Sequence, residues 1–187
     1  MMVIGYAILG NSSNDGSFFD EKTPDGVLCP ACGTCQNYSY TPTSIDISKS
    51  NKYDVSYTHD LRKLFSQRFT DYVRNELRAE NEFIPIQTHS SVYFYMFPQQ
   101  VIRFDVERRK TKFVNHCDTC GGYESIVGAY PGYYQISEPV GPGFYRSDIA
   151  FSSGSSKFPM FIVGGKWKEK LKSQKFRGIT FEEVYGT

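Results

Sequence analysis

The chain has 187 residues, 40% of them hydrophobic and 22% charged, and its formal net charge is +1. This length allows one substantial core or two compact halves. The near-neutral charge does not suggest a general binder of nucleic acid or membrane surfaces, because such proteins usually carry a basic excess. No apolar run is long enough to cross a bilayer as a helix, so no membrane association is expected.

The N-terminal segment MMVIGYAILG predicts a first strand over residues 3–9. It lacks a basic region before the apolar stretch, and Asn11 and Asp15 interrupt it early, so a strand fits better than a signal peptide. We therefore expect a cytoplasmic protein, in which thiols stay reduced. The odd count of five cysteines also argues against a disulfide framework.

The middle of the chain predicts a helix followed by strands. Ser66 is a candidate N-cap for a helix over residues 67–79, in which apolar residues share one face and Asn81 breaks the pattern. Residues 83–86 predict an edge strand, because an edge tolerates Pro85. Two more strands are expected over residues 91–97 (SVYFYMF), which are apolar on both faces, and over residues 101–106.

The C-terminal part repeats this order. A strand is expected over residues 160–163, a turn at Gly164 and Gly165, a helix over 166–175 that carries Trp167 and Leu171, and a last strand over 179–184. The likeness to residues 64–86 is weak, and shared packing of helices on sheets would produce it without any duplication.

These elements predict an α+β fold of mixed sheets with flanking helices. We expect a single domain over residues 1–187, with residues 1–106 and 107–187 as candidate similar halves.

All five cysteines lie in two stretches, CPACGTC (29–35) and HCDTCGG (116–122). Each contains Cys-x-x-Cys-Gly, the form of a zinc knuckle. Two intervening residues let both sulfurs of a tight turn face one ion, and the glycine supplies the positive φ that turns N–H groups toward the thiolates. The pattern predicts one structural Zn²⁺ in a closed four-sulfur site that joins the two halves; its ligands would be Cys29, Cys32, Cys117 and Cys120.

The spacing of the two motifs is unusual, because residues 33–116 separate them, whereas zinc ribbons commonly have roughly 15–20 residues between pairs. An ion held there would join distant parts of the chain, and its binding energy would contribute to folding. Two alternatives remain: unligated knuckles, or a thioredoxin-like redox pair, which normally opens a helix. Cys35 is expected to be a packed thiol, and His116 a poor ligand because a neighbour in sequence rarely points the same way.

Other motifs are weaker, and no enzyme activity is expected. Gly164-Gly165-Lys166 lacks the full phosphate-loop pattern and predicts a helix start. The basic run over residues 108–112 predicts a solvated hairpin turn rather than a phosphate site. His59 and His89 lie in no arrangement typical of nucleophilic catalysis, and no pair of carboxylates stands out.

Taken together, the two Cys-x-x-Cys-Gly motifs and the order of the surrounding segments resemble the double-CXXCG motif paralogous family. The resemblance covers nearly the whole chain; besides the motifs, its matching pieces are the helix start at Ser66, the strand at 83–86, the strand at 101–105, the segment GFYRSD at 143–148 and the closing segment GITFE at 178–182. The departures are Cys35 and the Gly164-Gly165 pair, where a serine-type cap is expected.

Members of that family are similar to immunity proteins of bacterial toxin systems. The resemblance implies a cytoplasmic protein that binds and neutralises a cognate protein toxin without catalysis. Tyrosines often serve as anchors at such interfaces; the candidates here are Tyr93, Tyr95, Tyr133, Tyr134 and Tyr145. The alternatives are a zinc-ribbon nucleic-acid-binding protein, which the neutral charge disfavours, and a thiol-disulfide or zinc enzyme, which a closed four-sulfur site disfavours.

Overall fold

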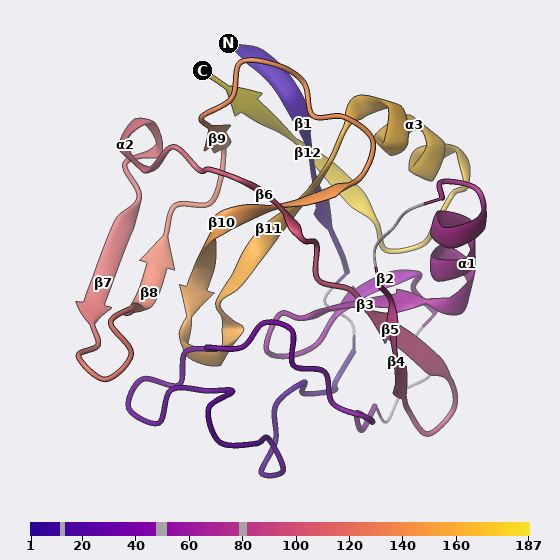
Figure 1. Ribbon diagram of the computed structural model, residues 1–187. Coiled ribbons are helices and arrows are strands. Elements are labelled where there is room, and N and C mark those ends of the chain that lie inside the picture. The colour runs from indigo at the N-terminus through magenta and orange to yellow at the C-terminus, as the bar shows by residue number, and fades with distance from the viewer. Residues whose placement is uncertain (12–13, 48–51, 79–81) are drawn as a thin grey trace.

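The computed structural model describes residues 1–11, 14–47, 52–78 and 82–187, whose strands form two sheets (Figure 1). The larger sheet contains β1 (Met2–Leu9), β6 (Gln100–Ile102), β7 (Lys112–His116), β8 (Tyr123–Val127), β9 (Gly132–Tyr134), β10 (Phe144–Ser153), β11 (Phe158–Val163) and β12 (Thr180–Gly186). Its strand order is β7-β8-β10-β11-β1-β12-β9, and β6 also pairs with β10. The pairs β10–β6 and β12–β9 are parallel and the others antiparallel, so the sheet is mixed.

The smaller sheet contains β2 (Val55–Tyr57), β3 (Lys63–Ser66), β4 (Ile84–Gln87) and β5 (Val92–Tyr95), in the order β2-β3-β5-β4. The helices of the described residues are α1 (Gln67–Asn75), α2 (Val106–Arg109) and α3 (Gly165–Ser173), with a 3₁₀ turn, η1, at Gly154–Ser156. The predicted α+β class with mixed sheets is confirmed, and sheet predominates. Each helix of the described residues is too short or too polar to cross a membrane.

Two strand–helix–strand units share one arrangement. In β3–α1–β4, strand β5 lies between the two strands and is antiparallel to both. In β11–α3–β12, strand β1 takes the same place between its neighbours. These are the two segments whose sequences look alike. Because β1 precedes residue 106 and both of its partners follow it, the larger sheet contains strands from both candidate halves, and the division into halves stays a prediction.

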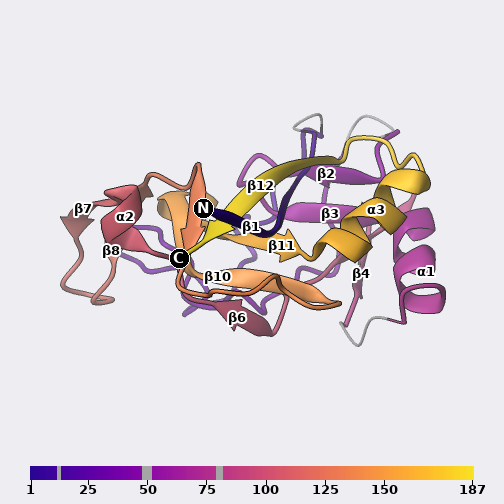
Figure 2. The same ribbon diagram turned by 90° about the horizontal axis from the view of Figure 1, so that it is seen from above.

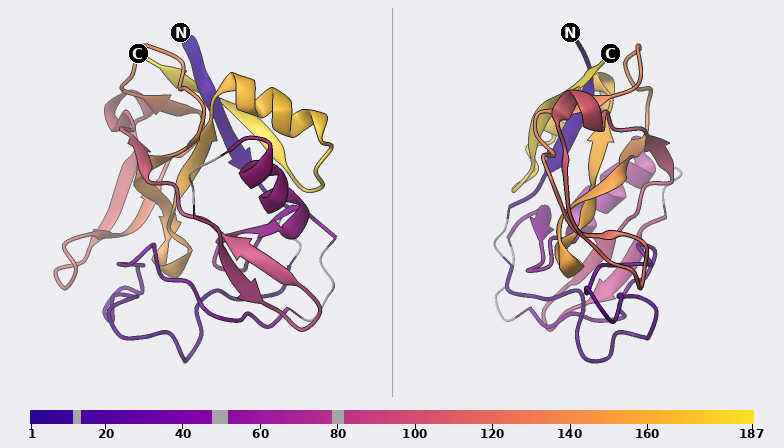
Figure 3. Two further views of the ribbon diagram at one scale, coloured as in Figure 1. Left: turned by 45° about the vertical axis from the view of Figure 1, so that its right-hand side comes forward. Right: turned by 90° about the vertical axis from the view of Figure 1, so that its left-hand side faces the viewer.

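The helices α1 and α3 lie side by side over a core that both sheets share (Figure 3). The rings of Phe69 and Phe176 are 5.1 Å apart, and the hydroxyl of Tyr72 donates a hydrogen bond to the carbonyl of Lys170. From Met160 to Val163, alternate residues of β11 face two core clusters, with Phe161 in the first and Ile162 in the second. Both faces of β11 are therefore buried.

Helix α1 begins where the sequence predicts. The Ser66 side chain accepts a hydrogen bond from the N–H of Phe69 at 3.2 Å, which satisfies one of the free donors at the helix start. The helix ends at Asn75, because the Tyr72 carbonyl accepts bonds from both Glu76 and Leu77 and the regular pattern stops. The predicted end at Ala79 and the predicted break at Asn81 lie outside the described residues.

Two strand predictions have different outcomes. The predictions for β4 and β5 are confirmed: β4 is an edge strand containing Pro85, and β5 is central to its sheet. The strand predicted over 101–106 is wrong in its second part, because β6 ends at Ile102. The Asp105 carboxylate accepts a bond from the N–H of Arg108 and begins helix α2. Arg108 and Arg109 therefore lie in a helix rather than a hairpin turn. Lys110 caps its end, and Lys112 begins β7.

Helix α3 begins at a glycine because a side chain does not fit there. A Cβ on Gly164 would lie 2.4 Å from the carbonyl oxygen of Val140 and 2.7 Å from that of Gly141. This contact explains why the expected serine-type cap is absent. The next residue, Gly165, has room, since the nearest atom to its Cβ would be a ring carbon of Tyr6 at 3.7 Å.

The two neighbouring glycines should therefore respond in opposite ways to alanine. Gly164→Ala should lower the free energy of unfolding by about 2 kcal/mol, because the backbone of residues 140–141 must move. Gly165→Ala should raise it by roughly 0.5 kcal/mol, since alanine favours the helix and restricts the unfolded chain. Equilibrium urea unfolding, followed by Trp167 fluorescence, measures both; equal effects would contradict the steric explanation.

Candidate metal centre

The first Cys-x-x-Cys motif forms a tight hairpin turn. Leu28 and Cys35 are paired across its base. The N–H of Cys29 donates to the carbonyl of Thr34, and the N–H of Gly33 donates to the carbonyl of Cys29, both at 2.8 Å. Gly33 has a φ of +70°, the left-handed conformation that glycine adopts without steric cost.

The second motif forms the same turn at the tip of the β7–β8 hairpin. The N–H of Cys117 donates to the carbonyl of Gly122 at 2.8 Å, and that of Gly121 donates to the carbonyl of Cys117 at 2.9 Å. Gly121 has a φ of +68°. The predicted positive φ at both glycines is confirmed. A Cβ at Gly121 would meet nothing within 4 Å, so the glycine serves the backbone conformation rather than a close contact.

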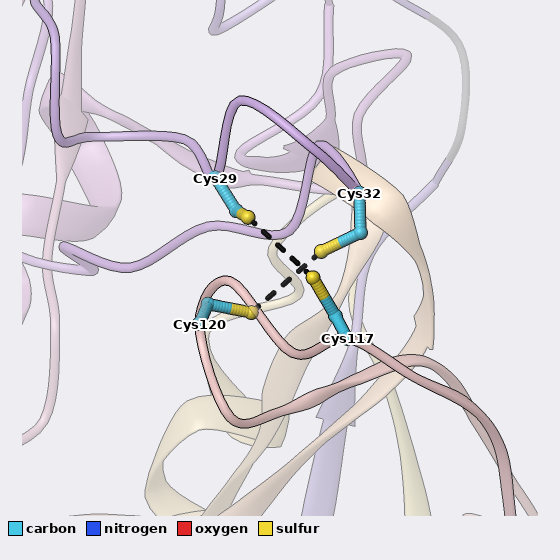
Figure 4. Close-up of side chains that lie close together, drawn as sticks. All are labelled: Cys29, Cys32, Cys117 and Cys120. Atoms are coloured by element: carbon cyan, nitrogen blue, oxygen red, sulfur yellow. Dashed lines mark hydrogen bonds between the residues drawn. The ribbon is translucent and has the colours of Figure 1, made fainter.

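The two turns face each other and bring four sulfurs together (Figure 4). All four Sγ atoms lie within 4.8 Å of one another. The distance from Cys29 to Cys117 is 3.8 Å, and that from Cys32 to Cys120 is 3.7 Å. A regular tetrahedron with metal–sulfur bonds of about 2.3 Å has edges of about 3.8 Å. The arrangement therefore fits a four-coordinate metal ion, whereas a disulfide needs a sulfur separation of about 2.05 Å.

The four thiols affect one another's ionisation. Hydrogen bonding with the side chain and backbone of Thr34 lowers the pKa of Cys32 to about 6; the Cys32 sulfur lies 3.3 Å from the Thr34 hydroxyl oxygen. At Cys120 a backbone bond from Gly122 acts in the same direction, but desolvation and the neighbouring thiols outweigh it and raise the pKa to about 11. Four thiolates this close repel one another, so a cation among them is needed to hold all four ionised.

A buried lysine completes the surroundings of the sulfurs. Lys157 is only 4% exposed, and its ammonium donates a hydrogen bond to the carbonyl of Tyr123, at the start of β8. Burial lowers the pKa of Lys157, while the nearby Cys32 and Cys120 act against that shift. The adjoining turn η1 lies against the first motif, since a Cβ on Gly154 would be 3.9 Å from the carbonyl of Cys32. Lys157 thus places a positive charge beside the thiols.

Hydrogen bonds on both sides of the first motif fix its long segment to the smaller sheet and to the loop between β2 and β3. The Asp60 carboxylate accepts hydrogen bonds from the backbone N–H groups of Phe18 and Phe19, both at 2.8 Å. The hydroxyl of Tyr95 donates to the carbonyl of Tyr38 at 2.7 Å. These bonds satisfy backbone groups of an irregular segment and hold the turn in the position where it meets the β7–β8 hairpin.

The remaining sulfur and imidazole candidates lie apart from the cluster. Cys35 is 3% exposed, and burial raises the pKa of its thiol, as expected for a packed residue. His116 is exposed, and its Nδ1 lies 3.2 Å from a carboxylate oxygen of Asp118. Sequence reasoning missed Lys157, because a lysine in the segment SSGSSK carries no signal of burial.

The basic run makes contacts within the protein. The guanidinium of Arg108 lies 4.7 Å from the ring centroid of Tyr133, and it donates a hydrogen bond to the carbonyl of Gly186. Arg109 donates a hydrogen bond to the carbonyl of Tyr130. These two residues therefore join α2 to the neighbouring segments.

Comparison with known proteins assigns no family to the chain. No protein-family model, no curated protein and no solved structure matches it. The likeness to the double-CXXCG family stays an expectation drawn from the motifs, and the chemistry of the four-cysteine cluster follows from its own geometry.

Proposed function

We propose that Cys29, Cys32, Cys117 and Cys120 hold one structural zinc ion. The spacing of the four sulfurs carries this proposal, because two of their separations match the edge of a tetrahedral site and all lie within 4.8 Å. Four thiolates are the ligand set of structural zinc, and they leave no coordination position for water or a substrate. The ion would supply the positive charge that the clustered thiolates require.

The zinc would act as a link between two parts of the fold. One motif lies in the irregular segment before β2, and the other lies at the tip of the β7–β8 hairpin, 88 residues farther along the chain. Closing a loop of this length costs conformational entropy, which the binding energy of the ion would offset. In this role the metal contributes to folding and takes no part in a reaction.

We further propose that the protein is an immunity protein, which neutralises a cognate toxin by binding it in the cytoplasm of the producing cell. The motif resemblance and the closed form of the four-sulfur cluster support this role over an enzymatic one. A rigid surface favours tight binding, because less conformational entropy is lost on association. Of the candidate anchors, Tyr133 and Tyr145 are half-buried at the surface, whereas Tyr93, Tyr95 and Tyr134 are buried in the core.

The nucleic-acid alternative is less well supported. It depends on the basic residues 108–112, and Arg108 and Arg109 in this run contact Tyr133 and backbone carbonyls. A protein of this class would also bind DNA or RNA with a strong dependence on salt.

Protein purified without chelator should contain one zinc per chain, which is released on denaturation. Mass spectrometry of the native and denatured forms measures this directly. Cys120→Ala should lose the metal and about 4 kcal/mol or more of stability, the size of effect that follows loss of a structural ion. Cys35→Ala is the matched control, and it should keep one zinc and lose about 1 kcal/mol. A metal-free wild-type protein, or a Cys120→Ala variant of unchanged stability, would rule out the structural zinc.

Removal of the charge at Lys157 should weaken zinc retention. Lys157→Met should lower the affinity for zinc about tenfold, as loss of a group that supports metal ligands commonly does. Competition with a coloured chelator measures the change. Lys157→Arg, which keeps the charge, should retain more of the affinity than Lys157→Met. Lys112→Met removes an exposed lysine from the β7–β8 hairpin, which carries the second motif, and should leave the zinc affinity unchanged. A folded Lys157→Met variant with wild-type affinity would show that the ammonium does not support the site.

Neutralisation should be stoichiometric. The toxin to test is the product of a gene next to the one that encodes this chain, expressed in a sensitive strain with and without the protein. Co-expression should restore growth, and with purified components inhibition should be complete at one chain per toxin. Complete inhibition by far less than one chain per toxin would indicate catalytic inactivation and contradict the proposal. Growth arrest that persists despite folded protein would contradict it as well.

A further inference from the structure

A pocket of about 410 Å³ opens beside the β7–β8 hairpin, at the point where the two core clusters meet. Phe158 in its wall belongs to the first cluster, whereas Ile126, Phe151 and Met160 belong to the second. The volume lies within the range of small-molecule sites, about 300–1,000 Å³. The pocket therefore lies between the two clusters, and its walls are apolar.

The mouth of the pocket is also apolar. Val127 and Leu61 line it and are 55% and 39% exposed. They extend the apolar wall to the surface. A ligand with a hydrocarbon body could therefore enter without contacting charged groups at the rim.

One cationic side chain lies in this apolar wall without an anionic partner. Lys63 is 4% exposed and lines the pocket. Its ammonium lies 4.9 Å from the ring centroid of Tyr57 and 4.6 Å from that of Phe161. Within the part of the chain that the structure describes, no hydrogen bond or ion pair joins this ammonium to another residue. Buried lysines are nearly always paired, whereas the Lys63 ammonium has no partner among the described residues and its Nζ is not fully enclosed, so it reaches the open space of the pocket.

Other buried or half-buried lysines of the described chain do have polar partners. Lys157 donates to the carbonyl of Tyr123, and Lys168 lies 2.7 Å from a carboxylate oxygen of Glu169. Lys168 also lies 4.6 Å from the ring centroid of Tyr6, so contact with an aromatic ring accompanies an ion pair there. At Lys63 the aromatic contacts are present and the anion is not.

A phenol, that of Tyr130, also lines the pocket. Burial raises the pKa of Tyr130, with smaller contributions from Tyr57 and Glu182, so its hydroxyl keeps its proton and can donate a hydrogen bond. Lys63 is the charged side chain among the residues that line the pocket, so an anionic group there would pair with its ammonium.

We propose that this pocket binds an amphiphilic carboxylate, with its hydrocarbon chain against Ile126, Phe151 and Met160 and its carboxylate paired with Lys63. One ammonium balances one negative charge, which favours a carboxylate over a doubly charged phosphate monoester. The apolar walls supply the affinity for the chain, and the buried ion pair supplies the selectivity for the head group. This site is separate from the four-cysteine cluster and does not depend on its role.

Isothermal titration of the 187-residue chain with straight-chain ligands tests the proposal. Decanoate, below its micellar concentration, should bind with one ligand per chain. Decanol should bind at least tenfold more weakly, because it lacks the charge, and decyltrimethylammonium should not bind. Octanoate should bind about tenfold more weakly than decanoate, since each buried methylene contributes roughly three- to fourfold. Equal affinity for decanoate and decanol, or no binding of decanoate, would overturn the proposal.

Variants locate the site. The Lys63→Met variant should still bind both ligands, but it should show no preference for decanoate over decanol. Lys168→Met is the matched control, because it removes a lysine that also contacts an aromatic ring but lies outside this pocket, and it should leave the preference unchanged. Ala129→Phe, which places a ring in the pocket, should abolish the binding of both ligands.

A measurement on the wild-type chain covers the case in which Lys63→Met does not fold. The NMR signal of the Lys63 side-chain amine should shift on addition of decanoate and stay unchanged on addition of decanol. Binding of decanoate that leaves this signal unmoved, or that persists in a folded Ala129→Phe variant, would place the ligand elsewhere and contradict the assignment.

Discussion

The meeting of the two Cys-x-x-Cys turns is the contact on which the arrangement of the irregular segments depends. The β7–β8 hairpin lies at one end of the molecule, far from α1 and α3 (Figure 2). Every residue of β7 is exposed, so little apolar burial holds this strand in place. The hairpin is positioned instead by the pairing of β8 with β10, by the bond from Lys157 to Tyr123 and by the four clustered sulfurs. A metal ion would make the last of these contacts strong.

The rest of the fold is held by burial around two central strands. Strands β1 and β11 lie next to each other, and their side chains supply both core clusters. The helices α1 and α3 cover the first cluster, whereas the irregular segments near β9 pack against the second. The two termini lie close together, because Met2 in β1 pairs with Gly186 in β12 (Figure 1). Strand β8 contributes both to the pocket, through Ile126, and to the surroundings of the sulfurs, through Tyr123, so the two sites share one element.

Local signals in the sequence were sufficient for much of this structure. The cap at Ser66, the proline in an edge strand and the two motif glycines each act within a few residues, and the structure has them as predicted. The four cysteines could be grouped from sequence, because the repeated Cys-x-x-Cys-Gly pattern identifies both turns. The short helix α2 was missed, although Asp105 three residues before Arg108 is a capping signal, because the apolar residues before it favoured a longer strand.

The sequence by itself determined the type of about half of the elements and the residues that form the sulfur cluster, since hydrophobic periodicity, caps and turn glycines are local properties. It predicted neither β2 nor the strands β7 to β10. Only the tertiary structure decided which strands are neighbours, why Gly164 replaces a capping serine, and that Lys63 and Lys157 are buried. Each of these depends on contacts between distant segments: the carbonyl of Val140 above Gly164, the aromatic rings around Lys63, and the thiols beside Lys157. A lysine has the same local preferences in either setting, so its burial appears only when the segments are packed together.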